Sequence, residues 1–279
     1  MTDQPAPAHT APRALPFTVD LRRIHLAVGW IAFGLPLSLV AVAWLPTVCH
    51  HDSISHFYFS PAGGDILVGA LSFIGLLMLC LYSFEAAGCE GARRWTRMDI
   101  FLIRLAGVAS LLVAFVPATG PGCNRAGIEG ARALLTGGND PSFDFWAVLL
   151  GRTEPTGFPL DAVHYIAAGV MFLILAYVVL RVFTRVNSEA ARKDGNRKSL
   201  RNACYLVLGR TILAMVAVLA VKMAVGRIAP EFLDVWNRLN LTFVCEAVGL
   251  GAFGLAWMIK GRFLPVFEDA AAKRQPRAA

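Results

Sequence analysis

Six apolar stretches, each long enough to cross a lipid bilayer, constrain what this chain can fold into. A hydrocarbon core about 30 Å thick requires about 20 apolar residues in a helix. Charged residues make up 16% of the chain, against roughly 25% in soluble domains. The sequence therefore predicts an all-α polytopic membrane protein, a bundle of six transmembrane helices. The stretches are residues 24–45, 65–84, 100–118, 160–180, 203–225 and 239–259.

A single membrane domain is predicted over residues 24–264, with no sizeable soluble domain. Residues 1–23 are polar and rich in Pro and Ala, which predicts a disordered cytoplasmic tail, and the first apolar stretch is expected to be a retained anchor. Residues 265–279 form a basic cytoplasmic tail. The long loop at 119–159 is rich in Gly and Pro. A loop of this length is a functional lid, a disordered segment or a tolerated insertion.

The distribution of Lys and Arg predicts the orientation. Of these residues, 18 lie in the two tails and in the second and fourth loops, and 5 lie in the other loops. Cytoplasmic loops carry the excess of positive charge, so both termini are predicted to be cytoplasmic, in a bacterial inner (plasma) membrane. This asymmetry and attraction to anionic lipids account for the net charge of +7 without nucleic acid. Membrane lipids are the expected partners, and the sequence indicates no oligomeric state.

Two cysteines fall in the predicted outside loops. Cys49 is in the first loop and Cys123 is in the third. A disulfide between them would tie these loops together if that side is a periplasm. The sequence alone does not establish the distance between them, so the pairing stays open.

Glu246 lies inside the last apolar stretch. A charged side chain near the centre of such a stretch costs on the order of 3 kcal/mol. We therefore expect it to face the bundle interior or a cavity and to have a partner. His56, Asp65 and His164 are candidate partners, because the alternating directions of the stretches place them toward the same side of the membrane.

The densest polar segment covers residues 50–58 and contains Ser53, Ser55 and His56. Neutral imidazole and carboxylate groups suit zinc, although the segment also fits an ordinary polar loop. His164 follows Asp161 by three residues on one helical face. An acidic neighbour of this kind can select the imidazole tautomer, and a histidine satisfied at the headgroup level is the alternative.

The residues from Ser53 to Tyr58, followed by those from Asp65 to Gly69, resemble an uncharacterised family of bacterial six-span membrane proteins. That family has an S-I-S-x-[YF]-[YF] … D-[IV]-[FL]-V-G signature. His164 and the last stretch around Glu246 are similar to it as well. The resemblance covers all six stretches and implies the six-span fold without an activity.

A more distant likeness is to the alkaline ceramidase-related superfamily of membrane hydrolases. Ser53 stands three residues before His56, and Asp65 follows nine residues later, which is similar to the Ser, His and Asp set of that superfamily. The likeness implies zinc-dependent hydrolysis within the membrane.

Three functions remain open. The first is a metal-dependent hydrolase of lipid amide or ester bonds at the outer face. His56, His164 and Glu246 would bind zinc, which lowers the pKa of a bound water toward about 7. Asp65 would act as the base, and Ser53 or Ser55 would hold the oxyanion. The second is a proton-coupled transporter or ligand-binding protein that uses Glu246 and the histidines. The third is a structural membrane component in which these groups hold helices together.

Overall fold

The structure is a computed structural model that describes residues 20–45, 48, 51–84, 95–116, 118, 160–185 and 195–267. Helices account for 87% of this part of the chain, and no strand occurs in it, which confirms the all-α fold. The two predicted tails lie outside the described residues, except for residues 20–23 and 265–267. So do the whole 119–159 loop, Cys49 and Cys123.

Six helices are long and apolar enough to cross a membrane, which confirms the predicted number of spans. A π-helical turn, η3 (Val178–Val182), continues α5. A short 3-10 helix, η4 (Pro265–Phe267), ends the described chain. The six helices are α1 (Leu21–Ala43), α2 (Pro61–Phe84), α3 (Arg97–Phe115), α5 (Leu160–Tyr177), α7 (Gly195–Ile228) and α9 (Leu241–Lys260).

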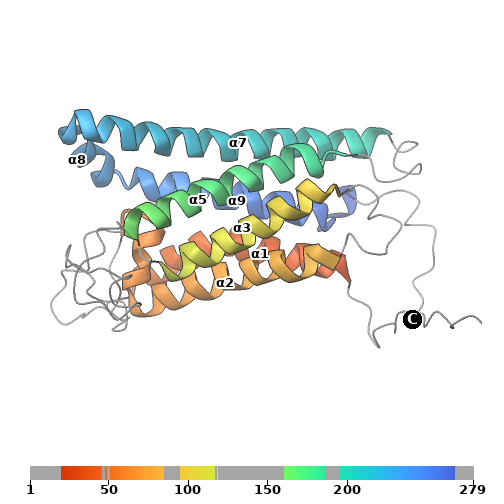
Figure 1. Cartoon of the computed structure of the whole chain (residues 1–279), viewed down its shortest axis with the longest axis horizontal. Helices are drawn as coiled ribbons and strands as arrows, with labels where there is room; N and C mark the ends of the chain where they lie inside the picture. Colours follow the sequence, from red (N-terminus) through yellow and green to blue (C-terminus); the bar gives the residue numbers. More distant parts are fainter. Residues whose placement is uncertain are drawn as a thin grey trace, which may run out of the picture.

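The helices form a closed ring in the order of the sequence. Each packs against the helix before it and the helix after it, and α1 closes the ring against α9. Figure 1 shows them running side by side along the long axis of the molecule. Apolar side chains such as Leu35, Leu67 and Phe253 fill the interior and are fully buried. The interior of the ring is therefore mainly apolar.

Glycines let two pairs of helices touch through their backbones. A Cβ on Gly107 of α3 would lie 2.8 Å from the carbonyl oxygen of Gly75 on α2. On α9, a Cβ at Gly254 would lie 2.7 Å from the carbonyl oxygen of Gly29 on α1. Small residues at such crossings permit close packing of membrane helices. These contacts hold α2 on α3, and α1 on α9.

The segment between α7 and α9 differs from the prediction. The fifth stretch, predicted at 203–225, is the middle of a 34-residue helix that extends past its neighbours in Figure 1. A second helix, α8 (Pro230–Arg238), replaces part of the predicted loop. Pro230 suits the first position of a helix. The indole of Trp236 is buried and donates a hydrogen bond to the Thr242 hydroxyl at 2.8 Å.

A 3-10 helix, η1 (Ser55–Phe59), connects α1 to α2. Its Phe57 and Tyr58 are almost completely buried, and Phe57 contacts the ring of Phe243 on α9. These aromatic side chains hold η1 against the end of the ring formed by the starts of α2, α5 and α9. We call this end of the bundle the η1 end.

Candidate functional site

The residues just before η1 are bound to the beginning of α9. The Asp52 carbonyl oxygen accepts a hydrogen bond from the Phe243 backbone N–H at 2.8 Å. The Ile54 backbone N–H donates to the Glu246 carboxylate at 2.6 Å. The Ser53 hydroxyl lies 2.9 and 3.1 Å from the two oxygens of the same carboxylate. Glu246 therefore has partners inside the bundle, and they are a hydroxyl and a backbone amide.

Ser55, the first residue of η1, forms a hydrogen bond with His164 near the start of α5. Its Oγ lies 2.9 Å from Nε2 of the imidazole. The other ring nitrogen, Nδ1, lies 2.6 Å from the backbone carbonyl oxygen of Val116, at the end of α3. A carbonyl oxygen only accepts, so Nδ1 carries the hydrogen. In the neutral imidazole Nε2 is then an acceptor, and the Ser55 hydroxyl donates to it.

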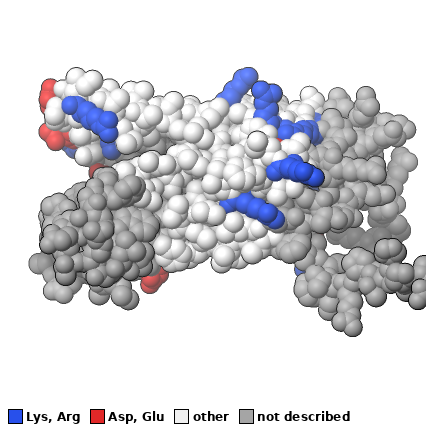
Figure 2. All heavy atoms as spheres, in the orientation of Figure 1, with Lys and Arg blue, Asp and Glu red and all other residues white. Residues whose placement is uncertain are grey.

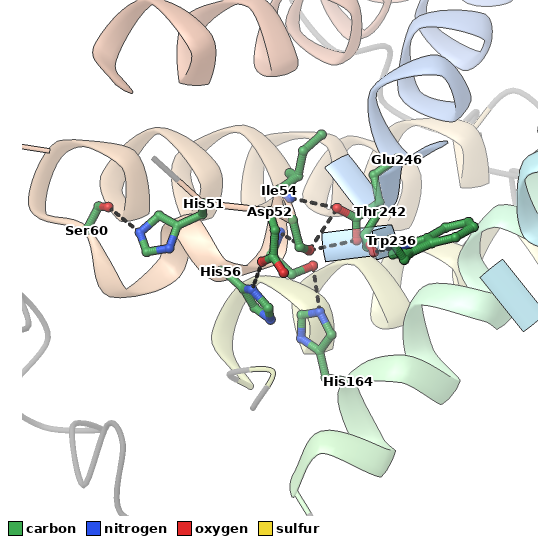
Figure 3. A network of polar contacts seen from close by, with 11 residues as sticks. His51, Asp52, Ile54, His56, Ser60, His164, Trp236, Thr242 and Glu246 are labelled. Carbon is green, nitrogen blue, oxygen red and sulfur yellow. Dashed lines mark hydrogen bonds and ion pairs between the residues drawn. The ribbon is translucent and has the colours of Figure 1, made fainter. Parts of the chain in front are cut away.

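One hydrogen-bonded chain joins these two pairs. The Ser55 backbone N–H donates to the Ser53 hydroxyl oxygen at 3.2 Å, and Ser53 donates to Glu246. Figure 3 shows Glu246 and His164 on either side of the segment that leads into η1. The chain of contacts runs from α9 through η1 and α5 to the end of α3. Each group in this chain forms a hydrogen bond with the next one.

His56 makes a separate contact with Asp52. Its Nδ1 lies 2.7 Å from a carboxylate oxygen of Asp52, and the pair is shown beside His164 in Figure 3. This hydrogen bond holds the pKa of Asp52 below its usual range. Burial acts in the opposite direction, and the charge of Lys222 adds a smaller lowering contribution. Asp52 therefore holds His56 and, through its backbone carbonyl, the start of α9.

The predicted zinc ligands do not converge in this arrangement. The part of the chain that the structure describes contains no group of three His, Cys, Asp or Glu side chains arranged to hold a metal ion. Both ring nitrogens of His164 are engaged, and Glu246 faces Ser53. These donors do not fit zinc as they stand. Ligation by His56, His164 and Glu246 stays a prediction.

Asp65 differs in exposure from the residues of this buried network. It lies in the first turns of α2 and its side chain is exposed, whereas Ser53, His56 and His164 are buried. Its predicted role as a base stays untested. The Asp161 side chain, expected to orient His164, lies outside the described side chains. Among the described contacts, the Val116 carbonyl orients the ring.

A small cavity adjoins Ser55 and Glu246. Its volume is about 30 Å³, and on this scale one water molecule requires roughly 10 to 15 Å³. Ser55 and Glu246 are its polar lining residues, and all the others are apolar. They come from α1, α2, α3, α5 and α9, and from Ile54, so the cavity lies on the axis of the ring. The apolar residues are Leu35, Ile54, Leu67, Leu71, Val113, Ala168, Met171, Phe172 and Leu250.

Sequence reasoning missed the backbone groups that orient the site. The Val116 carbonyl and the Ile54 amide carry no side-chain signal, and neither stands in a recognisable motif. Asp52 was within the polar segment but had no role assigned to it. Its spacing of four residues from His56 is the one available signal for their contact.

Comparison with known proteins does not assign the chain to a family. No protein-family model matches the chain, and no curated protein or solved structure matches it significantly. The resemblance to the six-span bacterial family and the distant likeness to the alkaline ceramidase-related superfamily stay predictions.

Proposed function

We propose that this membrane protein hydrolyses lipid ester or amide bonds, with Ser55 as the nucleophile and His164 as the general base. The observation that carries the proposal is the orientation of His164. The Val116 carbonyl accepts a hydrogen bond from Nδ1–H, so the Nε2 lone pair faces the Ser55 hydroxyl at 2.9 Å. A serine activated by an oriented imidazole is the arrangement that acyl transfer requires. Ser55 also lines the cavity, where a carbonyl group has access to its oxygen.

The proposed reaction has two steps. The Ser55 oxygen attacks the substrate carbonyl carbon while its proton passes to Nε2 of His164. The imidazolium returns that proton to the leaving oxygen or nitrogen as the carbon–heteroatom bond breaks, which leaves the acyl group on Ser55. Water then attacks the acyl carbonyl and gives a proton to Nε2. The acid leaves, and the proton returns to the Ser55 oxygen.

Glu246 and Ser53 act as positioning residues. Glu246 holds the Ile54 amide and the Ser53 hydroxyl, and Ser53 holds the Ser55 amide. These contacts set where the Ser55 backbone lies relative to α5. A misplacement of about 1 Å can cost on the order of 100-fold in rate, so loss of Glu246 lowers activity without removing a reacting group.

We place this site toward the outer side of a bacterial inner membrane. Helix directions put Arg22, Arg97, Arg181 and Lys260 at the end opposite η1. Figure 2 shows that most Lys and Arg side chains on the visible face gather toward that end. The positive-inside rule then makes that end cytoplasmic, with both termini on that side and η1 outside.

A second candidate is a proton-coupled or ligand-binding role for Glu246. The observation that favours it is the position of this carboxyl group on the wall of a cavity inside an apolar bundle. Ionisable groups at such positions mark ion and substrate pathways in membrane proteins. In this alternative, Glu246 binds the transported species and Ser55 serves only to hold η1.

Ester hydrolysis by the purified protein in detergent tests the proposal. The substrate is 4-nitrophenyl butyrate, and the variant is Ser55→Ala. We expect a loss of at least about 100-fold in kcat/KM. Ser60→Ala is the matched control, because the Ser60 hydroxyl also contacts a histidine, at 3.0 Å from Nε2 of His51, but does not line the cavity. It should keep the wild-type rate.

Equal rates for wild type and Ser55→Ala contradict the proposal. In that case, proteoliposomes distinguish the remaining functions. Proton-dependent uptake that is lost in Glu246→Gln supports transport. A Glu246→Gln protein whose only change is lower stability supports a structural component.

A further inference from the structure

We infer that the acyl group this site accepts is short, between acetyl and butyryl in length, so that the lipid part of the substrate is its leaving group. This inference rests on the proposed function. It concerns which side of the scissile bond enters the bundle, and it follows from the cavity and from the rigidity of its walls.

The volume of the cavity limits what can follow the carbonyl carbon. About 30 Å³ is space for about two to three water molecules. A methyl or methylene group is about as large as one water molecule. The cavity therefore holds about two or three carbon atoms beyond a carbonyl carbon bound at Ser55, which corresponds to a butyryl group or shorter.

The chemistry of the walls favours a hydrocarbon group. Beyond Ser55 and Glu246, the lining consists of aliphatic, Met and Phe side chains. An acyl chain buried there is stabilised by the removal of its methylene groups from water. A polar headgroup has two side chains in the cavity as possible partners, and one of them, Glu246, already binds Ser53 and Ile54.

The walls are held in place by contacts between helix backbones. The side chains of Leu71, Met171 and Leu250 are at least 95% buried. The Ser110 hydroxyl of α3 donates to the Leu71 carbonyl oxygen at 2.8 Å, close to the contact between Gly75 and Gly107. A longer chain would have to separate helices joined in this way. The remainder of the substrate must therefore lie outside the ring, toward the η1 end and the lipid.

A series of esters with acyl chains of different length measures this preference directly in the wild-type protein. The substrates are the 4-nitrophenyl esters of acetic, butyric, octanoic and palmitic acid in the same detergent. We expect kcat/KM for butyrate to exceed that for octanoate by at least about 10-fold, since one misfitting methylene is worth about 10- to 200-fold. Palmitate should be hydrolysed more slowly still.

Two variants test whether this cavity sets the limit. Met171→Ala enlarges it and should raise the octanoate rate relative to butyrate, while Ala168→Leu fills it and should leave acetate as the best substrate. Leu173→Ala is the matched control, because Leu173 is on the same helix but 49% exposed. It should keep the wild-type order of substrates.

The outcomes distinguish a failure of this inference from a failure of the proposed function on which it rests. Preference for octanoate or palmitate, with all hydrolysis lost in Ser55→Ala, overturns the short-chain inference and leaves the hydrolase standing. A wild-type preference for butyrate that neither cavity variant changes also overturns it. Absence of Ser55-dependent hydrolysis of any ester overturns the proposed function and this inference together.

Discussion

Ser55 donates its hydroxyl hydrogen to Nε2 of His164 across 2.9 Å, although 109 residues separate them in the sequence. The pairing depends on α5 beginning beside η1 and on the end of α3 supplying a carbonyl oxygen to the other ring nitrogen. Three separate elements therefore determine the tautomer of one histidine. The predictions below follow from this arrangement and from the contacts that support it.

Replacing His164 with Asn should separate folding from chemistry. The Asn amide can still donate to the Val116 carbonyl oxygen, but it offers no basic nitrogen to Ser55. We expect a loss of at least about 100-fold in ester hydrolysis, with a change in the free energy of unfolding of about 1 kcal/mol. Rate measurements and thermal unfolding in detergent test the two parts. Full activity in a folded His164→Asn protein would contradict the role of His164 as a base.

Replacing Glu246 with Ala should destabilise the protein. It leaves the Ser53 hydroxyl and the Ile54 amide without their acceptor inside the bundle. Each buried donor left unpaired costs about 1 to 3 kcal/mol, so a clearly lower unfolding temperature is expected. Glu246→Gln keeps one acceptor oxygen and should lie between Ala and wild type. Asp234→Asn, a change at an exposed carboxyl group of α8, serves as the control and should unfold like the wild type.

The contact between Asp52 and His56 predicts a pH dependence of stability. Because the folded pKa of Asp52 is lowered, its carboxylate stabilises the folded state above the unfolded pKa of about 3.9. That contribution is lost as the pH falls through the lowered pKa. Asp52→Asn should therefore unfold at a lower temperature than wild type at pH 6, and the difference should narrow toward pH 3. A difference that stays constant across this range would show that the carboxylate charge does not matter.

Replacing Gly254 with Ala should disturb the contact between α1 and α9. The added Cβ would lie 2.6 Å from the Phe33 backbone nitrogen, so the helices must move apart at a cost of about 1 to 3 kcal/mol. Gly251→Ala, on the same helix, is the matched control, because its Cβ would meet its nearest neighbour at 4.0 Å. Thermal unfolding of both variants gives the comparison. Equal effects would mean that α1 and α9 are not in close contact at Gly254.

The six spans could be predicted from the sequence because hydropathy is a local property of 20 residues. The α8 helix could not be, since nine residues of mixed polarity carry no transmembrane signal. It packs against the end of α7, where Leu233 covers Gly226. The sequence indicated that Glu246 needs a partner. Its partners are the Ser53 hydroxyl and the Ile54 backbone amide, because the residues just before η1 lie against the start of α9.

The residues of the site could be predicted from the sequence, but which of them pair with one another could not. Ser53, Ser55, His164 and Glu246 were all selected from the sequence, and the structure brings these four into one hydrogen-bonded chain. The pairing of Ser55 with His164 rests on a carbonyl group of Val116, which has no signature in the sequence. Asp65, selected with them, is on an exposed face of α2, and periodicity near a helix start does not reveal which face the ring will cover.

Covalent labelling of Ser55 tests the central claim most directly. The purified protein is incubated with a fluorophosphonate, which reacts with serines activated by a neighbouring base, and the labelled peptide is identified by mass spectrometry. The account predicts one phosphonate per chain on Ser55, with labelling lost in His164→Asn and kept in Ser60→Ala. No label on Ser55 in the folded wild-type protein, or equal labelling in His164→Asn, would contradict it.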